Sequence, residues 1–517
     1  MAGKIKCGNS LIDDKSVAQN AFVWEEEFAE VFAKGGFDVV IGNPPYVRQE
    51  MLALEAKNHF AANYATYHGM ADLYVFFVER GYSLLREGGK FSYIFPNKWM
   101  RAGYGKPLRT FLMDKNIEEI IDFGDLPVFE EATTYPLILT MSKREAQKTF
   151  KSVELKSLDF GDLGTFITEN AQTVAMSGLS AEGFSMGGEN GELLEKLKQN
   201  SITLSEYVSG EAYYGIKTGL TEAFMINELT KKALITADSK SIEVIKPFLA
   251  GRDVKQYEMP KAEKYLILFP KGSTRERAGI TAEAEAWEWL KKTYPAIAQW
   301  FEPFTEKGRK RTDQGGFWWE LRACAYYEEF EKPKIMYQTF QVKPAFVYDK
   351  SGIYCNNSMW ILPKDDKVLL AILNSKIGWF LISSYCTSIQ NGYQLIWKYL
   401  EQIPIPAIIS AVQRADIEKI VDTQLGFVAN LSNLQNEFKE YLSSALGVAK
   451  IPAKLDAPEK MSFDELQSAL SKLKVDMKDI SIFRSIKQLY EEMTALQKEI
   501  DRVDMEIDKA VSELYGI

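Results

Sequence analysis

Residues 38–46 read Asp-Val-Val-Ile-Gly-Asn-Pro-Pro-Tyr, an apolar segment, predicted to be a buried strand, that runs directly into Asn43-Pro44-Pro45-Tyr46. Pro44 restricts Asn43 to an extended conformation, and Pro45 has a fixed φ of its own. We therefore expect the Asn43 amide oxygen and the Pro44 carbonyl to be held at the strand's carboxyl end, where both can accept from one NH2 group. Tyr46 adds an aromatic face, and stacking of a base on such a face contributes about 1–3 kcal/mol. The tetrapeptide predicts chemistry on the exocyclic amine of an unstacked base.

An ordinary turn after a strand is the alternative interpretation, because Asn, Pro and the preceding Gly42 are common turn residues. Asn-Pro alone would favour that turn. Four specified residues in succession, however, occur by chance in a chain of this length with a probability of about one in a thousand. Their position directly after an apolar strand makes chance less likely still, so we favour the functional interpretation.

Composition limits the class of protein. The chain has 517 residues, too many for one core, and is 46% hydrophobic and 26% charged, as in soluble globular proteins with about three domains. No apolar run approaches the ~20 residues that span a bilayer, and the first residues lack a signal-peptide pattern, so we expect no membrane contact and a cytoplasmic protein. Four scattered cysteines and two histidines support neither a metal site nor a disulfide framework, and any cofactor is expected to be organic.

The net charge of −9 is unevenly distributed along the chain. Residues 1–199 carry 21 basic against 28 acidic residues, residues 200–406 carry 27 against 24, and residues 407–517 carry 14 against 19. Only the middle segment is net positive, and it holds the basic run Lys307 to Arg311, which we expect to be a Gly-bearing loop. Such a run is often only a solvated surface, so it supports nucleic-acid binding weakly.

Apolar periodicity divides the chain into four parts. From residue 37 to about 145, expected strands at 37–41, 90–95, 117–123 and 136–141 alternate with expected helices at 72–85 and 108–114, which predicts an α/β domain with a partial Rossmann-like sheet over residues 1–145. Ligands of such sheets bind at the carboxyl ends of the strands, where Asn43, Asn97 and Asp125 fall. Residues 146–200 are predicted to connect this domain to the next.

The remaining chain predicts a mixed domain and a helical tail. Residues 201–406 are rich in aromatics and turns, which favours a mixed α+β domain with strands at 223–226, 265–269, 334–339, 345–348 and 359–362. In residues 407–517, apolar residues from Phe483 to Leu514 repeat at three- and four-residue steps. That seam must pack against another helix. We favour a hairpin with the apolar residues between Ile417 and Tyr441 over a coiled coil with a partner chain.

With these motifs, nearly the whole chain resembles the amino-specific adenine DNA methyltransferases with an Asn-Pro-Pro-Tyr motif, and within them the combined restriction-modification enzymes of the Eco57I type. The similar segments in the first domain are residues 37–46, 72–74, 84–89, 93–99, 121–124 and 128–129. Those in the second domain, which resemble a target-recognition domain, are residues 215–219, 222–224, 248–254, 373–376 and 403–406, and residues 507–516 resemble the family's C-terminal helices.

The resemblance implies methyl transfer from S-adenosylmethionine to the N6 atom of an adenine flipped out of double-stranded DNA. Asn43 and the Pro44 carbonyl would then hold N6, with Pro45 keeping the turn rigid and Tyr46 stacking on the base. Phe129 matches a later aromatic of the family and would close on the base, although it is also explained as a core aromatic at a strand end. Asn9, in a segment similar to one that meets the cofactor's adenine, is the candidate cofactor contact.

Candidate DNA contacts in the second domain share a positive or hydroxyl-bearing side chain beside a glycine or within the basic run. They are Lys217, Thr218, Arg252, Lys307, Arg309, Lys310 and Arg311. The DNA sequence that they would recognise is not predicted.

The chain departs from the family ahead of residue 37. None of these 36 residues forms the Gly-x-Gly turn that holds the methionine end of S-adenosylmethionine. We therefore expect an incomplete fragment or one part of a split enzyme, completed by an N-terminal region or a second chain, with little or no methyl transfer alone. Two other functions stay open: a non-catalytic DNA-binding specificity module, and a methyltransferase for protein glutamine amides, which Asn-Pro-Pro-Tyr can also grip.

Overall fold

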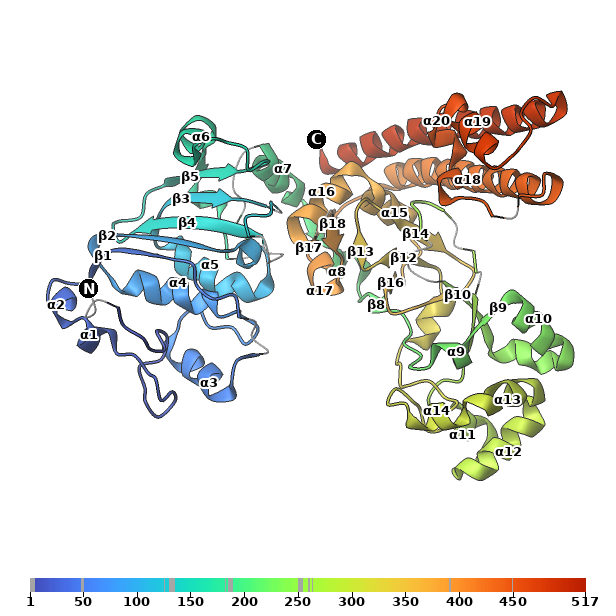
Figure 1. Ribbon diagram of the computed structural model, residues 1–517, viewed down its shortest axis with the longest axis horizontal. Helices are drawn as coiled ribbons and strands as arrows, with labels where there is room; N and C mark the ends of the chain where they lie inside the picture. The colour runs from blue at the N-terminus through green and yellow to red at the C-terminus, as the bar shows by residue number, and fades with distance from the viewer. Residues whose placement is uncertain are drawn as a thin grey trace. The chain divides into compact units, whose positions relative to one another are not determined.

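Two compact units make up the computed structural model of this chain (Figure 1). One contains residues 1–199 and 384–391, and the other contains residues 200–383 and 392–517. The change of unit at residue 200 lies where the sequence predicts the start of the second domain. Within the two units the structure describes residues 5–47, 51–124, 126–129, 135–181, 183–184, 189–249, 254–258, 261–262, 264–389, 392–448 and 450–517.

A six-stranded sheet with the order β1-β2-β4-β3-β5-β6 forms the centre of the first unit. β1 is parallel to β2, β4 runs antiparallel to its neighbours β2 and β3, and β3 is parallel to β5. This mixed sheet confirms the predicted α/β class. Its strands are β1 (Phe37–Gly42), β2 (Leu85–Pro96), β3 (Asn116–Asp122), β4 (Pro136–Ser142), β5 (Thr149–Glu154) and β6 (Gln172–Ala175).

Helices cover this sheet because their apolar faces need burial. Tyr74, Val75 and Val78 of α4 are fully buried and join Leu108 and Leu112 of α5 in the main core beneath β2 and β4. A smaller core on β3 and β5 contains Ile167 of α6. The helices of this unit are α1 (Trp24–Glu27), α2 (Ala29–Phe32), α3 (Leu54–Asn63), α4 (Tyr74–Ser83), α5 (Lys106–Met113), α6 (Leu163–Asn170) and α7 (Glu189–Lys198).

The segment predicted to connect the domains differs from that expectation. Residues 146–200 include β5 and β6, which pair with the sheet, and α6, which packs on it. Phe150 and Val174 are buried in the main core, and Val153 is buried in the smaller core on the other face. The two strands join the first unit because both of their faces bury apolar side chains when they extend the existing sheet.

β1 is not the buried strand that its apolar composition predicts. Val39 and Ile41 are 59% and 79% exposed, and β1 stands at one edge of the described sheet. At its start, Phe37 is held edge-on by the rings of Trp24, Phe28 and Phe32. The strand is therefore anchored by its first residue and by β2, while its outer side faces solvent.

Two four-stranded sheets organise the second unit, with the orders β15-β10-β11-β9 and β14-β12-β16-β8. Both sheets contribute to one aromatic-rich core, and this arrangement confirms the predicted α+β character. The strands are β8 (Tyr213–Tyr214), β9 (Met225–Asn227), β10 (Ile245–Leu249), β11 (Lys264–Ile267), β12 (Lys334–Gln338), β14 (Phe346–Asp349), β15 (Tyr354–Cys355) and β16 (Met359–Leu362).

The expected strand at 223–226 is only partly present, because residues 221–224 form the short helix α9 (Thr221–Phe224). Smaller strands extend the unit: β13 (Phe340–Gln341) pairs with β18 (Gly392–Gln394), and β7 (Ser201–Thr203) with β19 (Pro404–Pro406). Helices around the sheets include α8 (Leu204–Val208), α10 (Glu228–Ala237), α11 (Ser273–Ala278), α12 (Glu283–Thr293), α13 (Pro295–Phe301), α14 (Thr305–Lys310) and α17 (Trp397–Leu400).

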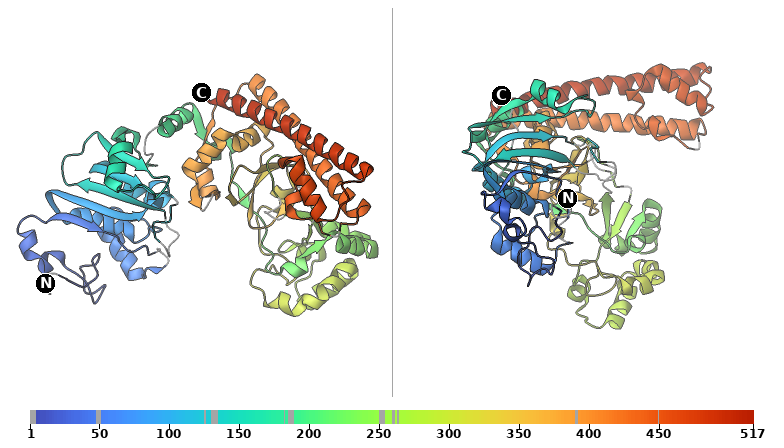
Figure 2. Two further views of the ribbon diagram at one scale, coloured as in Figure 1. Left: turned by 45° about the horizontal axis from the view of Figure 1, so that its top comes forward. Right: turned by 60° about the vertical axis from the view of Figure 1, so that its left-hand side comes forward.

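The tail folds back on itself as a helical hairpin. α18 (Ala411–Glu440) and α20 (Ile480–Tyr515) lie side by side, and α19 (Phe463–Lys472) packs near their far end (Figure 2). Gln424 contacts residue 504 while Phe438 shares a core with Ile486, so the two helices are antiparallel. The internal hairpin favoured by the sequence is therefore present, and its seam is buried within the chain.

Within the described part of the chain, no single helix is long and apolar enough to cross a membrane. α15 (Lys367–Asn374) and α16 (Lys376–Tyr385) have the required length and composition only when joined, and they are bent by 71° to each other.

Substitution of Met493 on α20 tests the assignment of the hairpin core. Its side chain is fully buried, so Met493→Ala should lower the free energy of unfolding by about 2–5 kcal/mol through lost burial and a residual cavity. Met505 of the same helix is 61% exposed, and Met505→Ala should change it by less than about 0.5 kcal/mol. Denaturant titration followed by circular dichroism measures both, and equal losses would contradict the assignment of the seam.

Candidate functional site

The Asn-Pro-Pro-Tyr segment follows β1 without a break, at the carboxyl end of the strand. Asn43 and Pro45 are exposed, Pro44 is buried, and Tyr46 is half-buried. The buried Pro44 anchors the segment, and its rigid ring leaves the Asn43 amide open to solvent. This places the Asn43 side chain at an accessible strand end, as a grip on an NH2 group requires.

Two aromatic rings meet at the Asn-Pro-Pro-Tyr segment. The rings of Tyr46 and Phe129 are 6.3 Å apart and cross at 72°, in an edge-to-face arrangement. The Tyr46 hydroxyl donates to the Ile94 carbonyl of β2 at 3.3 Å, and burial raises the pKa of Tyr46 to about 12, so the phenol stays neutral. The tertiary fold therefore brings together two aromatic residues that the sequence analysis proposed on separate grounds.

Gly42 provides the close packing under this segment. It lies opposite Tyr93 in the β1–β2 pair, and a Cβ atom at Gly42 would stand 3.0 Å from the Tyr93 ring. A Cβ atom at Gly81 of α4 would come within 2.9 Å of the Tyr93 hydroxyl. Tyr93 thus fills the space that two glycines leave and packs against the end of β1. The sequence analysis assigned no role to Tyr93. The indication in the sequence was Gly42, directly before Asn43, because a glycine within a strand often marks the close approach of another group.

A small hydrogen-bond network joins the ends of β2 and β3. Asn97, which follows β2, donates from Nδ2 to Asp122 Oδ1 at 2.9 Å, and the Gly124 amide donates to the same oxygen at 3.0 Å. Asp122 is 8% exposed, and this burial raises its pKa. Gly124 has a φ of +56°, which a glycine adopts without strain. The turn that leads toward Phe129 is thereby fixed to β2; Asp125 lies outside the described residues.

Asn9 does not follow a strand of the sheet. It forms an isolated bridge with Ala21, its amide donates to the Asn20 carbonyl at 2.6 Å, and its Oδ1 accepts from the Leu11 amide at 3.3 Å. The side chain therefore stabilises a local turn. Sequence similarity placed this segment at a strand end, whereas the structure gives it a turn and a single bridge.

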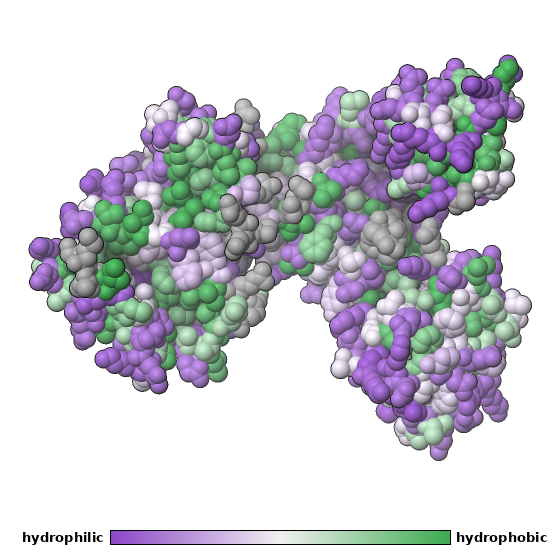
Figure 3. Space-filling model, viewed as in Figure 1, coloured by the Kyte–Doolittle hydropathy of each residue, from purple (hydrophilic) through white to green (hydrophobic). Residues whose placement is uncertain are grey.

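The predicted basic loop is largely a helix. Lys307, Arg309 and Lys310 lie on α14, at a surface that is mostly hydrophilic (Figure 3). Their side chains are exposed and form ion pairs with Glu222, Glu283 and Glu306, respectively. Lys217 is likewise exposed and lies 3.0 Å from a carboxylate oxygen of Asp313. Such exposed pairs contribute little to stability and exchange readily for other anions.

Arg311 and Thr218 are buried, unlike Lys217 and the exposed cations of α14. Arg311 is 8% exposed, and its guanidinium donates to the carbonyls of Thr218, Trp318 and Glu320 while stacking 4.4 Å from the centre of the Phe224 ring. Thr218 is 7% exposed. Both residues take part in core packing, and their contacts with DNA stay predictions that this burial does not favour. Arg252 lies outside the described residues.

No cluster of His, Cys, Asp and Glu among the residues that the structure describes has the arrangement of a metal site. The four cysteines are free thiols, of which Cys355 and Cys386 are buried. Burial raises the pKa of Cys355 to about 12, so this thiol is not reactive at neutral pH.

Comparison with known proteins identifies three segments of the chain. Residues 3–129 match the Eco57I restriction-modification methylase family, residues 246–405 match the TaqI-like C-terminal specificity domain, and residues 410–511 match a domain of unknown function. The first of these contains the Asn43 to Tyr46 segment and ends at Phe129. The last covers most of the helical hairpin.

Relatives with known names are distant in sequence. The chain is 23% identical to the Type II methyltransferase M.PaeR7I of Pseudomonas aeruginosa over 406 residues, which are 72% of this chain and 65% of that protein. It is 23% identical to the Type II methyltransferase M.BstVI of Geobacillus stearothermophilus, with 85% of this chain and 80% of that protein covered. The chain thus spans a little less than two thirds of the length of the first of these relatives.

A solved structure of the Type IIL restriction-modification enzyme MmeI in complex with DNA has a similar fold, with a TM-score of 0.51 at 12% sequence identity. The similarity covers 93% of this chain and 60% of that one. The chain is therefore similar to the Eco57I restriction-modification methylase family over residues 3–129, which contain the Asn-Pro-Pro-Tyr segment, and to a TaqI-like C-terminal specificity domain over residues 246–405.

Asp122 gives the candidate site a testable pH dependence. Because the pKa of Asp122 is raised, the folded protein holds the carboxyl proton more tightly than the unfolded chain does. The stabilisation that results is complete below the ordinary pKa of 3.8. It is lost as the pH rises through the raised pKa. Asp122→Asn cannot titrate and keeps an acceptor for Asn97 and Gly124. We expect a flatter dependence of unfolding free energy on pH, with stability at neutral pH no lower than that of the native protein.

Denaturant titrations between about pH 4 and pH 7 measure this dependence. Asp159→Asn, at an exposed position of the same unit, serves as the matched control and should leave the native pH dependence in place. A marked loss of stability at neutral pH in Asp122→Asn would contradict the predicted sign.

Proposed function

We propose that this chain is the base-binding and specificity part of a site-specific DNA adenine N6-methyltransferase of a restriction-modification system. The observation that carries the proposal is the exposed Asn43 amide on a buried Pro44, beside the crossed rings of Tyr46 and Phe129. A flipped adenine would place its flat ring against these aromatics and its N6 amine between the two acceptors.

The chemistry requires little more than positioning. The N6 lone pair of adenine is delocalised into the ring, so it is a weak nucleophile. Hydrogen bonds from its two N–H groups to the Asn43 oxygen and the Pro44 carbonyl favour a tetrahedral nitrogen with a free lone pair directed away from the protein. Tyr46 contributes its ring face, because its hydroxyl is already engaged with Ile94. We therefore assign no general base.

S-adenosylmethionine is the proposed methyl donor, because it supplies an electrophilic sulfonium methyl to an amine held in this way. The residues ahead of β1 fit this cofactor only in part. They contain no Gly-x-Gly turn, and the side-chain oxygen of Asn9, their one candidate, accepts from Leu11. The methionine end of the cofactor needs residues other than these.

The free edge of β1 suggests where such residues join. Among the described strands β1 pairs only with β2, in parallel, and it exposes Val39 and Ile41. Parallel strands are normally covered on both faces and flanked by further strands. We propose that additional strands, from an N-terminal region or from a second chain, pair with β1 and bring the glycine turn beside Asn43. The chain alone is then expected to transfer little or no methyl group.

Double-stranded DNA is the proposed partner, which implies a cytoplasmic enzyme. The exposed cations of α14, with Lys217, are suited to phosphate contacts because each can exchange a surface carboxylate for a phosphate. A non-catalytic specificity module is the second candidate, and the incomplete cofactor site favours it. Calorimetric titration with S-adenosylmethionine in the presence of the completing segment separates the two, since absence of binding there supports the module alone.

Asn43 is expected to be essential for transfer. In the chain combined with its completing segment, Asn43→Ala should lower methylation of duplex DNA by at least about a hundredfold, because one of the two acceptors for N6 is lost. Tyr46→Ala should also lower it, through lost stacking. Asn170→Ala, at an exposed position on α6, should have no effect. Transfer of labelled methyl groups measures activity, gel shifts measure DNA binding, and full activity of Asn43→Ala would rule out its assigned role.

The α14 cations predict a defined salt dependence of DNA binding. Each phosphate contact contributes about 0.9 to the slope of log affinity against log salt concentration, so replacing Lys307, Arg309 and Lys310 together by Gln should lower the slope by about 2 to 3. The matched control replaces three exposed lysines of the helical tail by Gln: Lys472, Lys478 and Lys498. An equal slope for both variants would show that α14 does not contact phosphates.

A further inference from the structure

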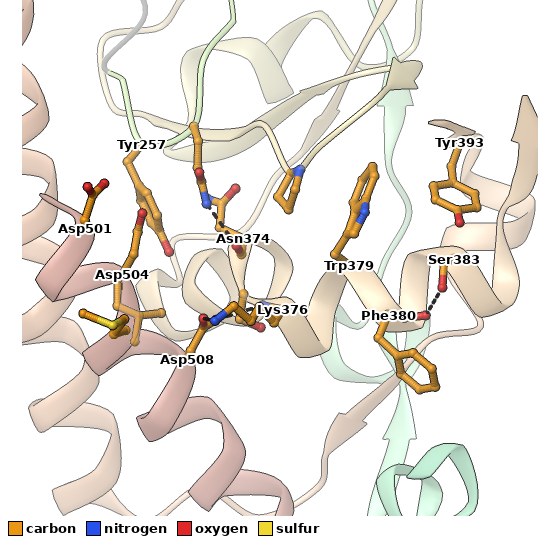
Figure 4. Close-up of a pocket in the computed structure, with 15 residues that line it drawn as sticks. Tyr257, Asn374, Lys376, Trp379, Phe380, Ser383, Tyr393, Asp501, Asp504 and Asp508 are labelled. Carbon is orange, nitrogen blue, oxygen red and sulfur yellow. Dashed lines mark hydrogen bonds and ion pairs between the residues drawn. The ribbon is translucent and has the colours of Figure 1, made fainter. Parts of the chain in front are cut away.

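The second unit contains a cavity of about 680 Å³ that is separate from the Asn43 segment. Its walls come from residues 374–383 of α15 and α16, residues 501–508 of α20, the segment at Gln256–Tyr257, and Tyr393 of β18 (Figure 4). A volume of this size is typical of sites for small organic molecules. None of the functions described above uses it.

One wall of the cavity is acidic. Asp501, Asp504 and Asp508 are spaced by three and four residues on α20 and therefore project from one side of the helix. Lys376 is the only basic residue of the described lining, and both its amide and its Nζ atom engage Asp508, at 2.8 and 3.1 Å. Three carboxylates thus face one cation, and the cavity has an excess of negative charge.

Tyr257 provides an independent sign of a missing ligand. Its side chain is 2% exposed and lines the cavity, with its hydroxyl directed toward the space between Asn374 and Asp508 (Figure 4). Among the described residues no partner meets hydrogen-bond geometry with this hydroxyl, although the Asn374 side chain lies near it. Buried polar groups nearly always have a hydrogen-bond partner, so the hydroxyl is placed to bond to a molecule in the cavity. The residue also adopts a φ of +59°, a left-handed conformation that is uncommon for an aromatic residue.

The opposite wall is aromatic. Trp379 and Tyr393 lie 5.2 Å apart with their rings crossed at 79°, and Phe380 follows Trp379 on the same helix. Aromatic faces attract cations and also pack against methylene groups. A ligand that satisfies both walls is therefore positively charged and has an aliphatic body.

The acidic wall changes the pKa of Asp504. Burial, followed by repulsion from Asp508 and Asp501, raises the pKa of Asp504 to about 6, although Gln424 donates a hydrogen bond to it at 2.7 Å. A cation near Asp504 would relieve that repulsion and favour the ionised form.

We propose that this cavity binds an aliphatic polyamine. Cβ atoms four residues apart on a helix are about 5–6 Å from each other, so Asp504 and Asp508 offer two anionic positions at a spacing that ammonium groups on a short methylene chain can match. The Tyr257 hydroxyl accepts from one ammonium group, and the methylene chain packs on Trp379 and Tyr393. The site lies between the helical tail and the specificity domain, so an occupied cavity links the two.

Calorimetric titration of the full chain with spermidine, in the absence of DNA and at low ionic strength, tests the proposal. We expect one saturable site. Asp504→Asn should weaken binding by about tenfold, and Tyr257→Phe should weaken it by a smaller factor, because a charged partner is lost in the first and only a hydroxyl in the second. Glu491→Gln removes one negative charge from α20 outside the cavity and should leave the affinity unchanged.

The pH supplies a second readout. Binding should weaken as the pH falls from about 7 to about 5, because Asp504 takes up a proton in that range. This loss should be reduced in Asp504→Asn. Circular dichroism confirms that each variant is folded.

Absence of a saturable site for spermidine would overturn the proposal. Equal affinities of Asp504→Asn and Glu491→Gln would overturn it as well, because they would show general attraction to an acidic protein. Binding of a lysine-rich peptide in place of spermidine would assign the cavity to a protein partner and would equally exclude a polyamine site.

Discussion

The parallel pairing of β1 with β2 holds the Asn-Pro-Pro-Tyr segment in place. Gly42 lies opposite Tyr93, and the Tyr46 hydroxyl bonds to Ile94, so both ends of the segment are fixed to the same strand. Through Asn97 and Asp122, the end of β2 is also joined to the turn after β3. The loops that carry Tyr46 and Phe129 therefore share one support, and their rings meet without any direct link in the sequence.

The same strand forms an open edge of the described sheet. β1 is supported on one side only, and its Val39 and Ile41 side chains face solvent, which is unusual for an apolar strand in a parallel pair. A partner for this edge would cover these side chains and place new residues beside Asn43. The proposed grip on an amine and the proposed additional strands thus both follow from the position of β1 at the sheet edge.

The basic run shows what a sequence pattern cannot predict about individual side chains. Lys307, Arg309, Lys310 and Arg311 are similar in composition, and the sequence predicts one role for all of them. Packing gives them different environments. The first three are exposed on α14, whereas the buried guanidinium of Arg311 donates hydrogen bonds to the carbonyls of Thr218 and Trp318. A guanidinium that satisfies three buried carbonyls is a structural group, and only the distant residues that supply those carbonyls decide this outcome.

Local patterns in the sequence determined the strand of residues 37–42, the Asn-Pro-Pro-Tyr tetrapeptide, the alternation of strands and helices, and the apolar seam of the hairpin. These features depend on neighbouring residues, which fix the backbone conformation and the face that becomes buried. The tertiary structure alone decided that β1 is an edge strand among the described strands, that residues 146–199 belong to the first unit, that Tyr46 meets Phe129, and that Asp504 and Tyr257 line one cavity. Each of these depends on which distant segments pack together, and short-range periodicity carries no information about that choice.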